Sequence, residues 1–144
     1  MIRAWLKRDT KGSTSVEFAV VGLLLCLVTF GAIEIGLLWW LKSGMQLTAS
    51  LTARCGAMGY TYNTSSFQCT STSTTQNYAV TTAQSWLLPN MLTAANVTVN
   101  GKVASCNGFS GNFFSVSLSS SYFQFPPPLG HYTTVSANAC FPMP

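Results

Sequence analysis

The sequence predicts an α+β fold, in which a long N-terminal helix packs on a small antiparallel sheet of three to four strands. Three observations support this prediction. Between Phe18 and Leu41 the only ionisable groups are Glu34 and the Cys26 thiol. Beyond Lys42 apolar residues recur at helical spacing, and after residue 96 they alternate with polar ones. A chain of 144 residues leaves room for one modest domain beside a membrane segment.

The apolar run from Phe18 to Leu41 favours a membrane-spanning helix. About 24 residues at ~1.5 Å each cross the ~30 Å hydrocarbon core. A cleaved secretory signal is the rival, but its apolar region would be shorter and would end in an Ala-x-Ala site, which is missing here. Four glycines interrupt the run and its continuation. They either let neighbouring helices approach closely or reflect ordinary glycine usage in membrane helices, and both interpretations stay open. These are Gly22, Gly31, Gly36 and Gly44.

The helix is expected to continue beyond the membrane, from about Thr14 to Met58. The stretch "SGMQLTASLTARCGAMGY" places apolar side chains at spacings of four, four and three, which is typical of an amphipathic helix facing a core. Gly56 and Gly59 are its predicted stops. The apolar positions are Leu47, Leu51, Cys55 and Met58.

The basic residues predict the orientation. Four cations precede the span against the single Asp9, and only Lys42 follows closely. The positive-inside rule therefore places the N-terminus in the cytoplasm and everything after residue 42 outside. This cluster accounts for most of the net charge of +4 and lacks an aromatic platform, so no nucleic-acid interface is expected. The four cations are Arg3, Lys7, Arg8 and Lys11.

The exported part argues against an enzyme. After Lys42 the charged side chains are Arg54 and Lys102, with one histidine, His131, and there is no Asp or Glu. Neither a carboxylate pair nor a Ser-His-Asp triad can form there. No phosphate-binding glycine loop is present, since Gly108 and Gly111 are expected in a turn. We therefore predict no catalytic residue, no cofactor and no metal.

Four of the five cysteines lie on the exported side, where disulfides persist. They are Cys55, Cys69, Cys106 and Cys140. Three pairings are possible, of which we favour Cys55–Cys69, closing a short loop, with Cys106–Cys140 in the C-terminal region. A zinc site is disfavoured because paired C-x-x-C spacing is missing. Cys26, inside the apolar helix, is expected to be a small packing residue.

Between the long helix and the sheet, "TYNTSSFQCTSTSTTQN" is expected to be a polar loop held by Cys69. A short helix is predicted over "YAVTTAQSWLLPN", ended by Pro89. Its predicted apolar side consists of Ala79, Ala83, Trp86 and Leu87.

The strands are predicted from alternation. "NVTVNGKVAS" is expected to be a hairpin that turns at Asn100-Gly101. In "NFFSVSLSSSYFQF" the side chains of Phe114, Val116 and Leu118 should face one way. "PPPLG" breaks this strand, and "HYTTVSANACF" forms the last one, with His131 at its edge.

The N-terminus resembles the class III signal sequence of type IV pilin-like proteins, because "KGSTSVEF" leads directly into the apolar helix. More narrowly, "KGSTSVEFAVVGLLL" and "FGAIEIGLLW", with "MQLTASLTARCGAMG" downstream, resemble the TadE/TadF-type minor pilins, or pseudopilins, of tight-adherence (Flp) pili. The resemblance is best over residues 7–59. Ser13 where other pilins carry Phe, and an inserted Ser/Thr-rich loop, are departures from the wider type IV pattern.

The resemblance implies a pilin-like fold and a three-part organisation. Residues 1–12 would be a cytoplasmic leader, residues 13–42 a transmembrane assembly helix, and residues 43–144 an exported, disulfide-stapled α+β domain. Prepilin peptidase would cleave between Gly12 and Ser13. The chain is much longer than a major Flp pilin, and this length favours a minor or priming role.

Glu17 would then be the fifth residue of the mature chain. It would lie ~6 Å, about one helical turn, from the new ammonium group of Ser13. In a fibre its carboxylate could instead meet a neighbour's ammonium and fix axial register, a use for which buried ion pairs are well attested. A carboxylate resting at the interface is the alternative. Glu34 lies deep in the span, where it either pairs across subunits, stays protonated, or snorkels outward.

The predicted function is that of a minor pilin, cut by prepilin peptidase and assembled into, or priming, a tight-adherence pilus for adhesion and biofilm formation. Its expected partners are the peptidase, other pilin subunits, the assembly platform and inner-membrane lipid, with a final location in the pilus at the cell surface. The alternative is a single-pass anchored binding module that never polymerises.

Overall fold

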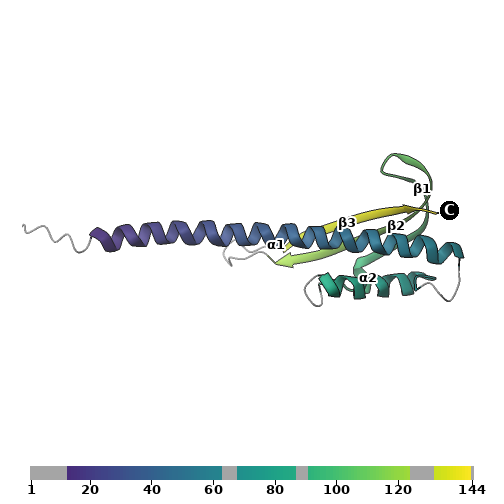
Figure 1. Ribbon diagram of the computed structural model, residues 1–144, viewed down its shortest axis with the longest axis horizontal. Helices are drawn as coiled ribbons and strands as arrows, with labels where there is room; N and C mark the ends of the chain where they lie inside the picture. Colours follow the sequence, from purple (N-terminus) through teal and green to yellow (C-terminus); the bar gives the residue numbers. More distant parts are fainter. Residues whose placement is uncertain (1–12, 63–67, 87–90, 124–131, 144) are drawn as a thin grey trace, which may run out of the picture. The chain divides into compact units, whose positions relative to one another are not determined.

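The computed structural model describes residues 13–62, 68–86, 91–123 and 132–143 (Figure 1). Within these ranges the chain forms two helices, a short 3-10 turn and three strands, and it divides into a unit up to Leu37 and a second unit from Leu38 onward. The predicted α+β class is confirmed, with three strands. The elements are α1 (Ser13–Tyr62), α2 (Thr72–Trp86), η1 (Ala94–Asn96), β1 (Val97–Cys106), β2 (Phe109–Phe123) and β3 (Tyr132–Pro142).

The C-terminal part of α1 packs on the sheet with a face that differs from the predicted one. The buried row recurs every four residues and consists of Leu41, Met45, Ala49, Ala53 and Ala57. The predicted row was wrong, since Leu47 is 40% exposed and its companions are only half-buried. Alanines let the helix backbone approach the sheet closely, whereas hydropathy alone favours the larger side chains on the neighbouring face.

Glycines in this part of α1 mark close approaches, so the predicted stops were also wrong. The helix continues through Gly56 and Gly59 to Tyr62. A Cβ on Gly56 would overlap the ring of Phe114, and one on Gly59 would overlap the carbonyl of Cys69. The contacts that require glycine here come from tertiary packing, which offsets the helix-propensity cost of about 1 kcal/mol per glycine.

The hydroxyl groups of two buried threonines on α1 form hydrogen bonds with backbone carbonyls of the same helix. The hydroxyl of Thr48 donates to the carbonyl of Gly44 at 2.8 Å, and that of Thr52 donates to the carbonyl of Thr48 at 2.7 Å. Both side chains are fully buried. Because each hydroxyl is satisfied inside α1, the polar groups enter the core without an unpaired donor.

The sheet is antiparallel with β2 at its centre, in the order β1-β2-β3. Pairing between β2 and β3 runs without interruption from Phe113↔Pro142 to Phe123↔Tyr132. Pairing between β1 and β2 is irregular after Asn100, with register shifts on both sides of Val103.

The β1–β2 turn lies at Asn107-Gly108, seven residues beyond the predicted turn. Both residues have positive φ, 50° and 86°, as a tight hairpin requires. The predicted turn residues, Asn100 and Gly101, lie inside β1 instead. The pairing of β1 with β2 shifts in register between Asn100 and Val103. Gly111 belongs to β2 and not to a turn. The sequence contains two Asn-Gly dipeptides, either of which could form a hairpin turn. Cys106 on β1 pairs with Phe109 on β2, so the turn lies at the second dipeptide, between these two residues.

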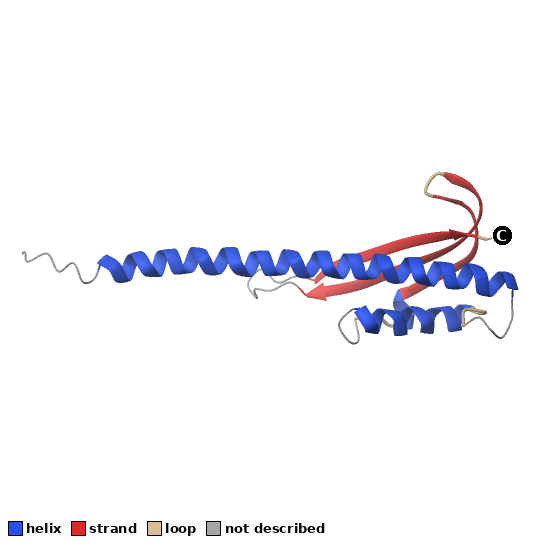
Figure 2. Ribbon diagram, viewed as in Figure 1, coloured by secondary structure: helices blue, strands red, loops and turns tan. Residues whose placement is uncertain are grey.

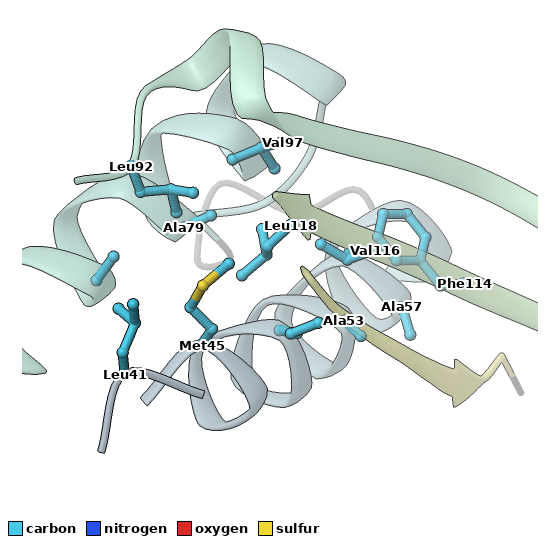
Figure 3. Close-up of a cluster of buried hydrophobic side chains, with 13 residues drawn as sticks. Leu41, Met45, Ala53, Ala57, Ala79, Leu92, Val97, Phe114, Val116 and Leu118 are labelled. Carbon is cyan, nitrogen blue, oxygen red and sulfur yellow. The ribbon is translucent and has the colours of Figure 1, made fainter. Parts of the chain in front are cut away.

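The core lies between β2, α1 and α2. The predicted inward positions Phe114, Val116 and Leu118 are confirmed, since each is at most 1% exposed. Figure 3 shows Leu118 and Met45 directed toward one another in the middle of this cluster. The Tyr60 ring packs on Phe114 with centroids 5.0 Å apart.

Helix α2 lies beside the C-terminal part of α1 (Figure 2) and starts six residues before the predicted start at Tyr78. Ala79 and Ala83 are buried as predicted, but Trp86 is 50% exposed. Leu87 and Pro89 lie outside the described residues. Threonine and serine have modest helix propensity, so the early start depends on packing and on the cap at Ser71, described below.

A glutamine from each helix binds a backbone carbonyl of an outer strand, one on β1 and the other on β3 at the opposite edge of the sheet. Gln76 of α2 donates to the carbonyl of Val97 on β1 at 2.9 Å. Gln46 of α1 donates to the carbonyl of Asn138 on β3 at 3.1 Å. Each bond ties its helix to the sheet.

Candidate functional site: the N-terminal apolar helix

The N-terminal part of α1 presents apolar side chains in every direction. No residue of its most apolar window is buried, and Phe18 is 79% and Val28 69% exposed. A helix that is apolar all round needs lipid or other apolar surfaces around it. The large exposed side chains are Val16, Phe18, Val20, Val21, Leu23, Leu24, Leu25, Leu27, Val28, Phe30, Ile33, Ile35 and Leu37.

This helix is long and apolar enough to cross a membrane, with a mean hydropathy of 2.4 in its best window. Its central hydroxyl is satisfied internally, because Thr29 donates to the carbonyls of Leu25 and Cys26 at 2.9 and 3.0 Å. That pattern suits a hydrocarbon environment, where an unpaired polar group is costly. Cys26 is a free and exposed cysteine.

The two carboxylates of α1 are far apart. Glu17 is exposed, whereas Glu34 is half-buried and its Oε1 atom is shielded from solvent without a hydrogen-bond partner among the described residues. Glu34 follows Glu17 by seventeen positions along the helix, which is roughly 25 Å along the axis. They cannot act together within one chain, so each needs its own explanation.

The predicted leader, residues 1–12, lies outside the described residues. This applies to Gly12 and to the four cations Arg3, Lys7, Arg8 and Lys11. Ser13 is the first residue of α1, and Glu17 follows it by about one helical turn. The cleavage site, the register role of Glu17 and the orientation therefore stay predictions.

The four cysteines that follow Lys42 form two disulfides, in the pairing that the sequence favoured. Cys55 joins Cys69 with their Cα atoms 5.7 Å apart, which ties α1 to the segment before α2. Cys106 joins Cys140 with their Cα atoms 6.4 Å apart, which ties the end of β1 to β3. No group of three metal-ligating side chains occurs within the described ranges.

The segment that contains the N-terminal apolar part of α1 matches a known protein family. Residues 12–54 match the family model of TadE-like protein. The N-terminal segment is TadE-like. The match confirms the resemblance that its motif predicted, over somewhat less than a third of the chain. It indicates a structural protein associated with the tight-adherence pilus. No curated protein and no solved structure matches the chain.

The TadE-like segment contains the whole exposed apolar helix. It also contains the buried row of α1 from Leu41 to Ala53, but not its last member, Ala57. It ends at Arg54, immediately before the first disulfide cysteine. The sequence did not predict the first part of α2, because residues 72–77 were assigned to a loop. The signal for that helix was weak: Thr75, Ala79 and Ala83 repeat every four residues, but none is large and apolar.

Proposed function

We propose that this protein is a minor pilin, or pseudopilin, of a tight-adherence pilus and serves surface attachment. It is made as a precursor, cut by prepilin peptidase between Gly12 and Ser13, and assembled through its N-terminal helix. The observation that carries the proposal is the apolar helix, exposed on all sides, that begins directly after Gly12 within the TadE-like segment. The peptidase, other pilin subunits, the assembly platform and inner-membrane lipid are the proposed partners.

The position of Glu17 supports this proposal. Cleavage after Gly12 leaves an ammonium group on Ser13, and Glu17 lies one turn further along the same helix. In a low-dielectric environment, opposite charges at that spacing attract strongly, whereas either charge alone would be costly. The carboxylate therefore favours burial of the new N-terminus, and a neighbouring subunit's ammonium could take the same place in the fibre.

The orientation follows from the same proposal. The basic leader stays in the cytoplasm, and the unit from Leu38 onward faces an oxidising exterior, which suits its two disulfides. Before assembly the helix is surrounded by inner-membrane lipid, and afterwards by the helices of neighbouring pilins. Both environments are apolar, so the same exposed side chains suit each of them.

N-terminal sequencing tests the proposal directly. In cells with active prepilin peptidase, the membrane-bound protein should begin at Ser13, and in cells without the peptidase it should begin at or near Met1. A Gly12→Leu variant should accumulate as precursor in both strains, whereas a Gly22→Leu variant should be cut normally. A protein that keeps its leader in the presence of the peptidase would favour the alternative, an anchored binding module that never polymerises.

A further inference from the structure

We propose that an open depression beside α2 binds a neutral saccharide. This depression, here called the α2 site, has a volume of about 370 Å³. It is lined by Gln68, Thr74, Asn77, Tyr78 and Thr81. The proposal goes beyond pilus assembly, because it concerns α2 and the segment before it, outside the TadE-like residues 12–54.

One wall of the α2 site is a face of the helix. Thr74, Tyr78 and Thr81 follow one another at spacings of four and three, and Asn77 lies beside them, so they share one side of α2. The side that packs into the core carries Thr75, Ala79 and Ala83. Burial of the small residues therefore fixes which polar side chains α2 presents outward.

The other wall is held by a disulfide. Gln68 directly precedes Cys69, which is fully buried and bonded to Cys55 of α1. Tyr60 of α1 also reaches α2, since its hydroxyl lies 2.9 Å from that of Thr72. Gln68 and α2 are thus both tied to α1, and this limits how far the two walls can move apart.

The start of α2 is fixed by a reciprocal cap. The amide of Ser71 donates to the Thr74 hydroxyl at 2.9 Å, and the amide of Thr74 donates to the Ser71 hydroxyl at 3.3 Å. This arrangement matches a capping box, with threonine in place of the usual glutamate. Because Thr74 also lines the α2 site, the cap orders one of its walls before any ligand arrives, and this lowers the entropy lost on binding.

The polar groups available in the site suit hydroxyl-rich ligands. The hydroxyls of Thr74 and Thr81 already bind backbone carbonyls of their own helix turn. The amides of Gln68 and Asn77 and the hydroxyl of Tyr78 have no hydrogen bond to another described residue. Each amide offers both donors and an acceptor, as neighbouring sugar hydroxyls require. The Tyr78 ring adds an apolar surface for the C–H face of a sugar ring.

The described lining of the α2 site offers no charged side chain to pair with an ionic ligand. None of the five described lining residues is an Asp, Glu, Lys, Arg or His, and the two cations that follow Lys42 in the sequence, Arg54 and Lys102, are not among them. A charged ligand would lose hydration without gaining a counter-ion. A peptide is also a poorer fit than a sugar, because α2 uses its own backbone groups and offers no strand edge for an extended chain.

The size and openness of the site predict weak binding of small saccharides. A volume of about 370 Å³ is near the lower end of the range for ligand sites, ~300–1,000 Å³. We expect it to hold one or two sugar rings, with a dissociation constant on the order of 1 mM. Binding of this strength becomes useful when many copies act together on one surface.

Saturation-transfer NMR on the full chain tests the proposal, in a detergent whose head group is not a sugar. The probes are glucose, galactose, N-acetylglucosamine and their β-1,4-linked dimers, with glucuronate and the tripeptide Gly-Ala-Ser for comparison. At least one neutral saccharide should bind saturably. Asn77→Ala should weaken that binding about five-fold, the effect of one hydrogen bond worth ~1 kcal/mol. Gln84→Ala, an exposed amide two turns further along α2, should not change it.

Three results would overturn the proposal: no saturable saccharide binding, equal effects of Asn77→Ala and Gln84→Ala, or tighter binding of glucuronate or the tripeptide. Tyr78→Phe serves as a second variant, because it keeps the ring and removes only the hydroxyl. Circular dichroism should show that all variants keep the wild-type fold. The assay needs neither cleavage nor assembly, so its failure would not affect the proposed pilin function.

Discussion

The ring of Phe114 lies against the backbone of Gly56, so closely that a Cβ at position 56 would overlap the ring atoms. Phe114 comes from the central strand and is fully buried, and Gly56 comes from the last turns of α1. This single contact sets how near the helix and the sheet can lie. It also explains why a helix continues through a residue that usually weakens helices.

Gly56→Ala should destabilise the unit from Leu38 onward although alanine is the better helix former. The added methyl group forces the packed ring of Phe114 to move, and we expect a loss of about 1–2 kcal/mol in the free energy of unfolding after the gain in propensity. Thermal unfolding of the full chain in detergent measures it. Gly101→Ala is the matched control, because the nearest atom to its added Cβ would lie at an ordinary 3.5 Å. Equal stabilities would contradict the close contact.

Met45→Ala should be far more costly than Leu47→Ala. Met45 is fully buried against the core, whereas Leu47 is 40% exposed. We expect a loss of about 2–5 kcal/mol for the first and less than about 0.5 kcal/mol for the second. Chemical unfolding of both variants measures the difference. A larger loss of stability for Leu47→Ala than for Met45→Ala would indicate that the face predicted from hydropathy, which contains Leu47, is the one that packs on the sheet.

The turn at Asn107-Gly108 should not tolerate a β-branched residue. Asn107 has φ of 50°, a conformation that asparagine accepts and valine strongly disfavours. Asn107→Val should therefore cost about 1–2 kcal/mol of unfolding free energy, and Asn107→Gly should change little. Asn100→Val serves as the comparison, because Asn100 lies in β1 and is expected to accept valine. A larger effect at position 100 would place the turn there.

The two disulfides should differ modestly in their contribution to stability. The chain-entropy relation gives about 3 kcal/mol for the loop of 14 residues and about 3.8 kcal/mol for the loop of 34. Removal of each pair by double Cys→Ser substitution, followed by unfolding, measures both values. Non-reducing peptide mapping should find these two pairs with Cys26 as a thiol. A peptide that links Cys69 to Cys106 would refute the pairing.

Glu17→Ala should leave cleavage intact and impair assembly. Cleavage depends on the residues around Gly12, whereas the carboxylate is needed only once Ser13 carries a free ammonium group. We expect normal N-terminal sequencing together with a loss of the protein from the sheared pilus fraction, and Glu17→Asp should restore part of the incorporation. Ser15→Ala, a small change two residues earlier, is the control. Normal incorporation of the Glu17→Ala protein would remove the register argument.

The sequence by itself determined the elements whose signal is local. The apolar run of α1 is visible because nearly all of its residues are hydrophobic and Glu34 is its one charged side chain, and the motif after Gly12 predicted the TadE-like resemblance. Inward alternation at Phe114, Val116 and Leu118 was equally clear, because one face of a half-buried strand must be apolar. The α+β class follows from these elements together.

Only the tertiary structure decided which small residues face the core and which Asn-Gly pair turns. Ala49, Ala53 and Gly56 carry little hydropathy, yet the two alanines are buried in the core and Gly56 leaves room for the ring of Phe114. Asn107-Gly108 turns because Cys106 and Phe109, which flank it, pair with one another across β1 and β2. Likewise, α2 is helical from Thr72 because its alanines and Thr75 find a core to fill. Local signals state what a residue prefers, whereas packing decides among preferences of nearly equal energy.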